Sequence, residues 1–169
     1  MTDPSWRISP LAAQDCAELG RVHIQVWRET YAGQMPADYL AGLSAERSAA
    51  NWLRGLQEAE PRDLEGATLV ARDATDRILG FASAGPTRDE DAPTEWELYV
   101  INLVEGAHGT GLADELVGRV VGDRDASLWV VEANARARAF YTRHGFVPDG
   151  GRTAHEATGA PEVRLVRRS

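Results

Sequence analysis

A glycine-rich turn is the clearest chemical signal in this 169-residue chain. Gly109-Thr110-Gly111 follows an apolar run and precedes a helical pattern that begins at Leu112. Glycine lets the backbone approach a ligand closely, and the first amides of a helix point outward at the positive end of its dipole. We therefore expect an anion-binding cradle, with a plain tight turn as the alternative, built from the backbone amides of Gly109, Thr110, Gly111, Leu112 and Ala113.

Two ligands compete for such a cradle. The first is a dinucleotide, because the turn begins a G-x-G-x-x-G pattern and Glu132, at the end of the next expected strand, stands where a ribose-binding acid would lie. Asp114 occupies the third glycine position, however, and a carboxylate there would face the pyrophosphate or crowd the helix against the strand. The second ligand is coenzyme A.

The charge balance narrows the classes of function. The chain has 26 acidic and 18 basic residues, for a net charge of −8, which argues against general binding to nucleic acids or anionic membranes. Every basic residue is arginine. A sequence without lysine excludes a P-loop NTPase with its phosphate-binding lysine, a protein kinase of the usual pattern, and Schiff-base or pyridoxal-phosphate chemistry.

Neither a metal site nor an export signal is expected. The four histidines have no metal-ligand spacing, and the single cysteine, Cys16, supplies neither a zinc cluster nor an internal disulfide. The first ten residues carry an acid and prolines where a signal peptide has a basic start and an apolar run, and no stretch approaches the roughly 20 apolar residues of a membrane span. A cytoplasmic location is therefore the expectation.

Hydrophobic periodicity predicts one mixed α/β domain over residues 1–169. The expected helices are residues 14–31, a turn of helix that ends at Leu40, a helix capped by Ser44, one that follows Gly111, and residues 134–144. The expected strands are residues 6–9, 67–71, 78–82, 95–104, 127–131, one that begins at 146, and 163–166. The polar stretch 85–93 is expected to be a loop.

Two stretches resemble motifs of the GNAT superfamily of N-acetyltransferases. Residues 97–116 resemble motif A, a long strand followed by R/Q-x-x-G-x-G/A, and residues 128–146 resemble motif B, a strand followed by N-x-x-A-x-x-F-Y-x-x-x-G-F. The departures are His108, where Arg or Gln is common, and Glu105, where Pro often follows the strand. Neither departure affects a cradle that is made of backbone amides.

The resemblance implies a GNAT fold, a mixed α/β architecture with a central, mostly antiparallel sheet of about six or seven strands flanked by about four helices. It also implies acetyl-CoA as the acetyl donor and no metal, with His108 beside the cradle. The strand of motif A would splay from its neighbour. Backbone groups near Leu103 and Val104 would then pair with the pantetheine arm, and an amide there would polarise the thioester carbonyl.

Catalytic roles also come from the resemblance. Tyr141 falls on the tyrosine of motif B, where its phenol would protonate the leaving thiolate, and a core aromatic pair with Phe140 is the alternative. Glu97 falls where many members carry a general-base glutamate; a solvated strand carboxylate, the neighbouring Glu95, and a chain of waters are the alternatives. Asn134 begins the motif B helix as an N-cap, as a cofactor contact, or as both.

The resembled fold places the acceptor opposite coenzyme A, between the first helices and the last strands. Trp27, Tyr31 and Glu97 are the expected substrate-binding residues; Met35 and Trp52 lie in the same region, and core packing explains each of these apolar residues equally well. The acidic charge favours a cationic amine. We expect a small-molecule or peptide amine as acceptor and no nucleic-acid or membrane partner. The sequence is compatible with a homodimer and does not decide the oligomeric state.

Three functions remain open on the sequence alone. The first is an acetyl-CoA-dependent N-acetyltransferase that acts on a primary amine. The second is a non-catalytic acyl-CoA sensor with the same fold, which would need the cradle but neither Tyr141 nor Glu97. The third is an NAD(P)-binding oxidoreductase.

Overall fold

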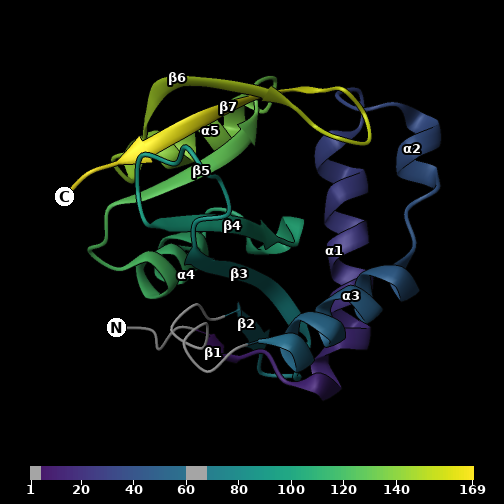
Figure 1. Ribbon diagram of the computed structural model, residues 1–169. Coiled ribbons are helices and arrows are strands. Elements are labelled where there is room, and N and C mark those ends of the chain that lie inside the picture. The colour runs from purple at the N-terminus through teal and green to yellow at the C-terminus, as the bar shows by residue number, and fades with distance from the viewer. Residues whose placement is uncertain (1–4, 60–67) are drawn as a thin grey trace.

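The computed structural model describes residues 5–59 and 68–169. Within these ranges the chain forms a seven-stranded sheet and five α-helices (Figure 1). The strands are β1 (Trp6–Pro10), β2 (Thr68–Asp73), β3 (Ile78–Pro86), β4 (Trp96–Leu103), β5 (Ala126–Val131), β6 (Val147–Ala154) and β7 (Pro161–Arg167). The helices are α1 (Cys16–Tyr31), α2 (Ala37–Ala41), α3 (Ala45–Glu58), α4 (Leu112–Val121) and α5 (Ala135–Arg143), with short 3-10 helices η1 (Ala13–Asp15) and η3 (Glu105–Ala107).

The strands lie in the order β1-β2-β3-β4-β5-β7-β6. Every neighbouring pair is antiparallel except β4 and β5, which run parallel. This confirms the expected mixed, mostly antiparallel sheet. In the described part of the chain, no helix is long and apolar enough to cross a membrane. The expected strand start at Ala67 lies outside the described residues.

Helices cover both faces of the sheet. Phe81 and Ala82 are neighbours on β3, so their side chains point to opposite faces. Phe81 packs with apolar residues of α1, and Ala82 packs with apolar residues of α4. Tyr141 of α5 belongs to the same core cluster as the α4 residues. Hence α1 and α3 lie on one face and α4 and α5 on the other, as Figure 1 shows.

The helices α1 and α3 pack closely because of Gly20. A Cβ at this position would lie 2.4 Å from the Ala45 carbonyl oxygen and 2.9 Å from the Ala49 Cβ, so no larger residue fits. Ser44 caps α3, with its hydroxyl oxygen accepting a hydrogen bond from the Arg47 amide at 3.2 Å. The expected N-cap at Ser44 is therefore confirmed. The closely packed helices α1 and α3 form one wall of the site described below.

The strands β4 and β5 diverge soon after they begin. Their register holds only two pairs, Trp96 with Ala126 and Glu97 with Ser127. Beyond these, β4 continues to Leu103 and β5 to Val131 without pairing to each other. At about 3.3 Å per residue, the unpaired edge of β4 is about 20 Å long. The expected splay of this strand from its neighbour is thus present.

The loop after β3 begins later than expected. β3 extends to Pro86 instead of ending at Ala82, because Gly85 and Pro86 pair with Glu97 and Trp96 at the start of β4. The indole N–H of Trp129, on β5, donates to Asp89 at 2.6 Å and so ties the loop to the sheet. The loop therefore lies over the closed end of the splay.

Candidate active site

The glycine turn forms an open backbone cradle at the start of α4. Gly109 and Gly111 have φ angles of 74° and 91°, in the left-handed region that favours glycine. A Cβ built at either position meets nothing within 4 Å, so the space above the turn is empty of protein. The Thr110 hydroxyl donates to the Ala107 carbonyl at 2.7 Å, which fixes the turn. The Leu112 amide lies 3.4 Å from the Thr110 hydroxyl oxygen, and the turn leaves open space at the start of α4.

The carboxylates of the first turn are held by partners in the protein. Asp114 lies 2.8 Å from Nε2 of His144, at the end of α5. Glu115 accepts from the indole of Trp6 at 2.8 Å, and that hydrogen bond lowers the pKa of its carboxyl. The Asp114 pair explains why a carboxylate is tolerated at the position where a dinucleotide fold needs glycine.

The unpaired edge of β4 differs from the expectation at Val104. The Val104 amide donates to the Leu79 carbonyl at 2.9 Å, and the Val104 carbonyl accepts from the Ala107 amide at 2.9 Å. The prediction of a free backbone group at Val104 is therefore wrong. Antiparallel hydrogen bonds engage alternate residues of a strand. Since Val104 bonds to β3, the backbone groups of Leu103 and Ile101 face the splay.

Ile101 is therefore a backbone position that the sequence interpretation missed. The signal that could have found it is the alternation along β4 counted from a bonded residue, which needs the register with β3. His108 also differs from a simple phosphate contact, because its Nε2 lies 3.1 Å from the Leu103 carbonyl oxygen and holds the turn against β4.

Tyr141, Asn134 and Tyr31 come together from α5 and α1. Tyr141 is 9% exposed, and its burial together with the nearby Tyr31 raises the pKa of the phenol, which stays protonated at neutral pH. Burial raises the pKa of Tyr31, and a hydrogen bond from the Asn134 side chain opposes that shift. Asn134 also accepts from the Ala137 amide at 3.1 Å, so its expected N-cap role is confirmed. Tyr141 contacts Phe140 at a 5.5 Å centroid separation, so the aromatic pair exists as well.

Glu97 lies at the closed end of the splay, where its carboxylate forms an ion pair with Arg88. The carboxylate is buried, with the whole residue 2% exposed. One oxygen accepts from Nη2 of Arg88 at 2.7 Å, and the other accepts from the Arg88 amide at 3.0 Å and Nε at 3.3 Å. The alternative of a solvated carboxylate is therefore wrong. Direct acceptance of a proton from a bound amine needs Arg88 to move or a water to intervene.

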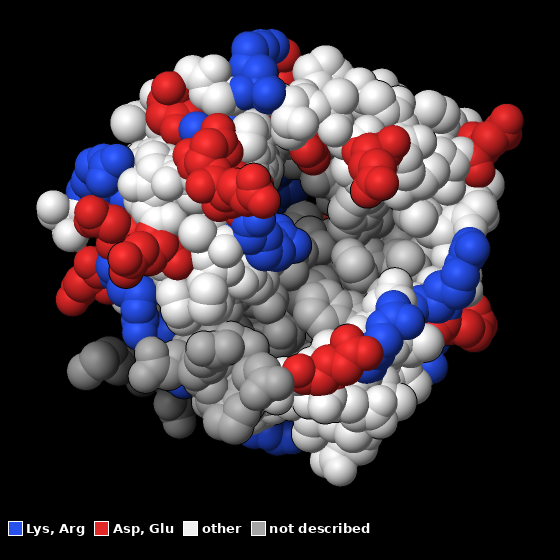
Figure 2. Space-filling model, viewed as in Figure 1, with Lys and Arg blue, Asp and Glu red and all other residues white. Residues whose placement is uncertain are grey.

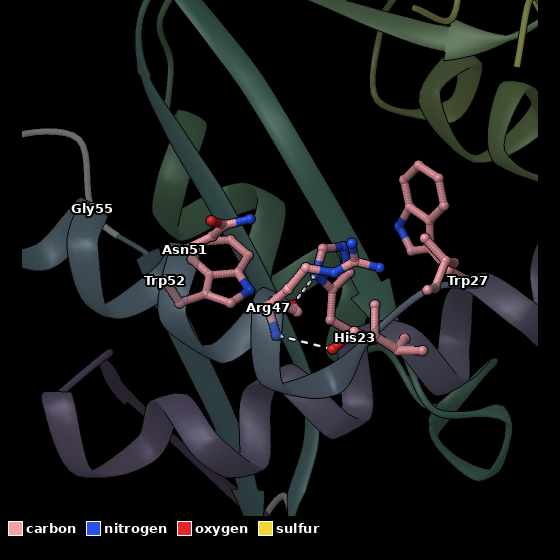
Figure 3. Close-up of a pocket in the computed structure, with 10 residues that line it drawn as sticks. His23, Trp27, Arg47, Asn51, Trp52 and Gly55 are labelled. Atoms are coloured by element: carbon pink, nitrogen blue, oxygen red, sulfur yellow. Dashed lines mark hydrogen bonds between the residues drawn. The ribbon is translucent and has the colours of Figure 1, made fainter. Parts of the chain in front are cut away.

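A cavity of about 510 Å³ lies between α1 and α3 on the face opposite α4. Trp27 and Trp52 line it, and so do His23, Arg47 and Asn51, which the sequence interpretation did not single out (Figure 3). These residues lie on two separate helices, so the sequence does not indicate that they share a cavity until the packing of α1 against α3 is known. Met35 instead packs in the core with Leu40 and is 6% exposed.

The cavity is connected to the tyrosines by ring contacts. The ring centroids of Trp27 and Tyr31 are 4.8 Å apart. Figure 2 shows that this face of the molecule is hollowed beside the helices α1 and α3. Among the described residues, no group of three or more His, Cys, Asp or Glu side chains could hold a metal ion. The site is thus a cradle, a strand edge, a tyrosine pair and a lined cavity.

Comparison with known proteins identifies the family of this chain. The model of the acetyltransferase (GNAT) family matches residues 25–146. The chain is 32% identical over 127 residues to YuaI, an uncharacterized N-acetyltransferase of Bacillus subtilis, and the match covers 72% of this chain and 69% of that one. The fold is similar to the PaiA N-acetyltransferase of Thermoplasma acidophilum, solved in complex with coenzyme A (TM-score 0.69, 19% identity, 98% and 99% coverage), and to Ard1 of Thermoplasma volcanium (TM-score 0.65, 15% identity, 96% and 97% coverage). Since the family model spans more than half of its residues, this chain belongs to the acetyltransferase (GNAT) family.

Proposed function

We propose that this protein transfers the acetyl group of acetyl-CoA to a primary amine by direct attack in a ternary complex. The observation that carries the proposal is the splay of β4 from β5 beside the open cradle of Gly109 and Gly111. An extended pantetheine arm has backbone-like amides that pair with an unpaired strand edge, and a pyrophosphate is stabilised by amides at a helix start. Both lie next to each other here, and the PaiA structure with coenzyme A has a similar fold.

Backbone groups do the binding in this proposal. The amides of Gly109 to Ala113 hold the pyrophosphate, and the backbone of Ile101 together with the Leu103 amide pairs with the pantetheine arm, because His108 already contacts the Leu103 carbonyl. Bound acetyl-CoA supplies the activated thioester. An N–H of the β4 edge, aimed at the thioester oxygen, stabilises the negative charge that develops when the amine attacks. Such donors are preorganised because β3 holds the other edge of β4.

Tyr141 acts on the leaving thiolate. Its raised pKa keeps the phenol protonated at neutral pH, so it donates a hydrogen bond to sulfur as the C–S bond breaks. A free thiol has a pKa of about 8.5, below that of the phenol. Tyr141 therefore stabilises the thiolate chiefly as a hydrogen-bond donor, and full proton transfer to sulfur can follow from solvent.

The amine must lose a proton, since only the neutral form attacks. At a pKa near 10.4, about one alkylamine in 10³ is neutral at pH 7. Glu97 takes this proton in the proposal, through an ordered water or after Arg88 has swung away from the carboxylate. The contact with Arg88 also favours the second candidate function, an acyl-CoA sensor, because a carboxylate that stays locked cannot serve as a base.

Thermal unfolding with acetyl-CoA, CoA, NAD and NADP tests the binding half of the proposal. A ligand at 100 times its dissociation constant adds about 2.7 kcal/mol of stability, or roughly 5–10 °C in Tm for a domain of this size. We expect this shift with acetyl-CoA and CoA and none with NAD or NADP. A shift with the dinucleotides alone refutes the proposal and favours the oxidoreductase.

Release of free CoA over a panel of primary amines tests the transfer half. An acetyltransferase releases thiol in proportion to acetylated amine, and mass spectrometry of the amine checks the product. Acetyl-CoA binding with no release of thiol for any amine would support the sensor instead.

A further inference from the structure

The cavity between α1 and α3 has an unusual charge for an acidic protein. Among the described residues that line it, Arg47 is permanently charged and none is a carboxylate. His23 adds no charge, because burial lowers its pKa to about 4. Figure 2 shows both basic and acidic side chains along the rim over α3, so the positive charge is that of the cavity wall itself. The cavity is thus a positive site within a chain whose net charge is −8.

The walls of the cavity suit a flat apolar group. His23 meets Trp27, Trp52 and Phe81 in edge-on contacts, with ring centroids 5.9, 5.8 and 5.5 Å apart. The Ser48 hydroxyl holds Nδ1 of His23 at 2.9 Å, which fixes the ring. Rings held in this way present both faces and edges to an entering group, and binding cavities of this size are usually apolar with a few polar anchors.

The guanidinium of Arg47 is placed to act as such an anchor. Figure 3 shows it reaching over His23 toward Trp27. Nη2 donates to the Gly42 carbonyl at 2.8 Å, which steadies the side chain. A guanidinium has five N–H donors in a fork that matches a carboxylate, so donors beyond this bond are available to a ligand.

One side of the cavity leads to the reacting end of the site. Trp27 contacts Tyr31, and Tyr31 is hydrogen-bonded to Asn134 and lies close enough to Tyr141 to raise its pKa. Trp27 and Arg47 line the same cavity, so a ligand that packs against Trp27 on the side of Tyr31 can also place a polar group near Arg47.

We propose that the acceptor is an amine that also carries a carboxylate and a large apolar group, as an aromatic amino acid does, and that Arg47 binds the carboxylate. The inference rests on the proposed function and narrows its substrate class. It reverses the expectation from net charge, which favoured a cationic acceptor, because charge at the cavity wall acts on the bound ligand while net charge acts on encounter. A polyamine would place a second cation beside Arg47.

Three acceptors separate the alternatives: L-phenylalanine, 2-phenylethylamine, which lacks the carboxylate, and spermidine, which is polycationic. In the parent protein we expect kcat/KM for phenylalanine to exceed the other two by about tenfold or more, as loss of a charge-assisted hydrogen bond predicts. Arg47→Gln should lower kcat/KM for phenylalanine about tenfold and leave 2-phenylethylamine within about twofold. Arg47→Lys, which keeps the charge, should restore part of the loss.

Arg21→Gln is the matched control, because Arg21 lies on the same helix pair in the neighbouring groove and does not line the cavity. It should leave all three acceptors unchanged. Calorimetric binding of phenylalanine to the CoA-loaded protein gives a readout without turnover, and Arg47→Gln should weaken that binding.

Equal or better kcat/KM for spermidine or 2-phenylethylamine in the parent overturns the inference, as does an equal loss for all acceptors in Arg47→Gln. Absence of phenylalanine binding to the CoA-loaded protein also overturns it. Failure of the protein to bind acetyl-CoA at all is a different result, since that outcome refutes the proposed function itself.

Discussion

Replacing Gly111 with alanine separates the cradle from the fold, because the chain contains a matched control. Gly111 has a φ of 91° and Gly150, on β6, has a φ of 92°. A Cβ at either position meets nothing within 4 Å, so neither substitution creates a clash within the protein. Both variants therefore place an L-residue at nearly the same positive φ, and only Gly111→Ala adds a methyl group at the start of α4.

The expected magnitudes follow from the positive φ that the two glycines share. A left-handed conformation costs an L-residue about 1–2 kcal/mol, which corresponds to a Tm lower by roughly 2–8 °C in a domain of this size. Both variants should lose stability within this range. Acetyl-CoA affinity should fall at least about tenfold, or about 1.4 kcal/mol, in Gly111→Ala and stay unchanged in Gly150→Ala.

Isothermal titration calorimetry with acetyl-CoA, at a temperature well below both melting points, measures the difference. Parent-like affinity in Gly111→Ala would show that the pyrophosphate does not lie over this turn. An equal loss of affinity in both variants would trace the effect to strain and would equally refute the cradle.

Three further predictions concern side chains. Tyr141→Phe should lower kcat by about 10²–10³, as loss of one hydrogen-bond donor to a developing negative charge does, with little change in acetyl-CoA affinity; unchanged turnover would leave Tyr141 with only its core packing against Phe140. Glu97→Gln should lower the rate at neutral pH and let it recover as pH rises toward the pKa of the amine, and a pH–rate profile that overlays the parent's removes Glu97 as the base. His23 has an ordinary pKa of 6.5 that falls to about 4 in the fold, so the unfolded chain takes up the proton first on acidification. The free energy of unfolding should therefore fall between pH 6.5 and about 4, by up to about 3 kcal/mol; urea unfolding of His23→Gln should lack that component, and an unchanged slope would contradict the assignment.

Local chemistry was enough to predict much of the fold. The cap at Ser44, the glycine turn before α4 and the cap at Asn134 each follow from side chains that act on neighbouring backbone. Such contacts span a few residues, so a single sequence contains all of the information they need. The splay of β4 and the Tyr141 position came from the family resemblance, which local patterns alone do not supply.

The remaining features depend on partners far apart in the chain. Val104 was expected to be free, but its amide is used by Leu79, and only the register between two strands reveals this. The ion pair that holds Glu97 forms because the loop after β3 brings Arg88 back onto β4. Arg47 and His23 belong to separate helices, and they share a cavity because Gly20 allows those helices to pack closely.

Amide hydrogen exchange with and without acetyl-CoA tests the central claim most directly, because it shows where the ligand lies. We predict added protection in peptides that cover Ile101 to Leu103 and Gly109 to Asp114, with no change in peptides from β2 or β6. Protection elsewhere in the chain, or none in these two segments despite calorimetric binding, would contradict a cofactor site at the splay of β4 and the start of α4.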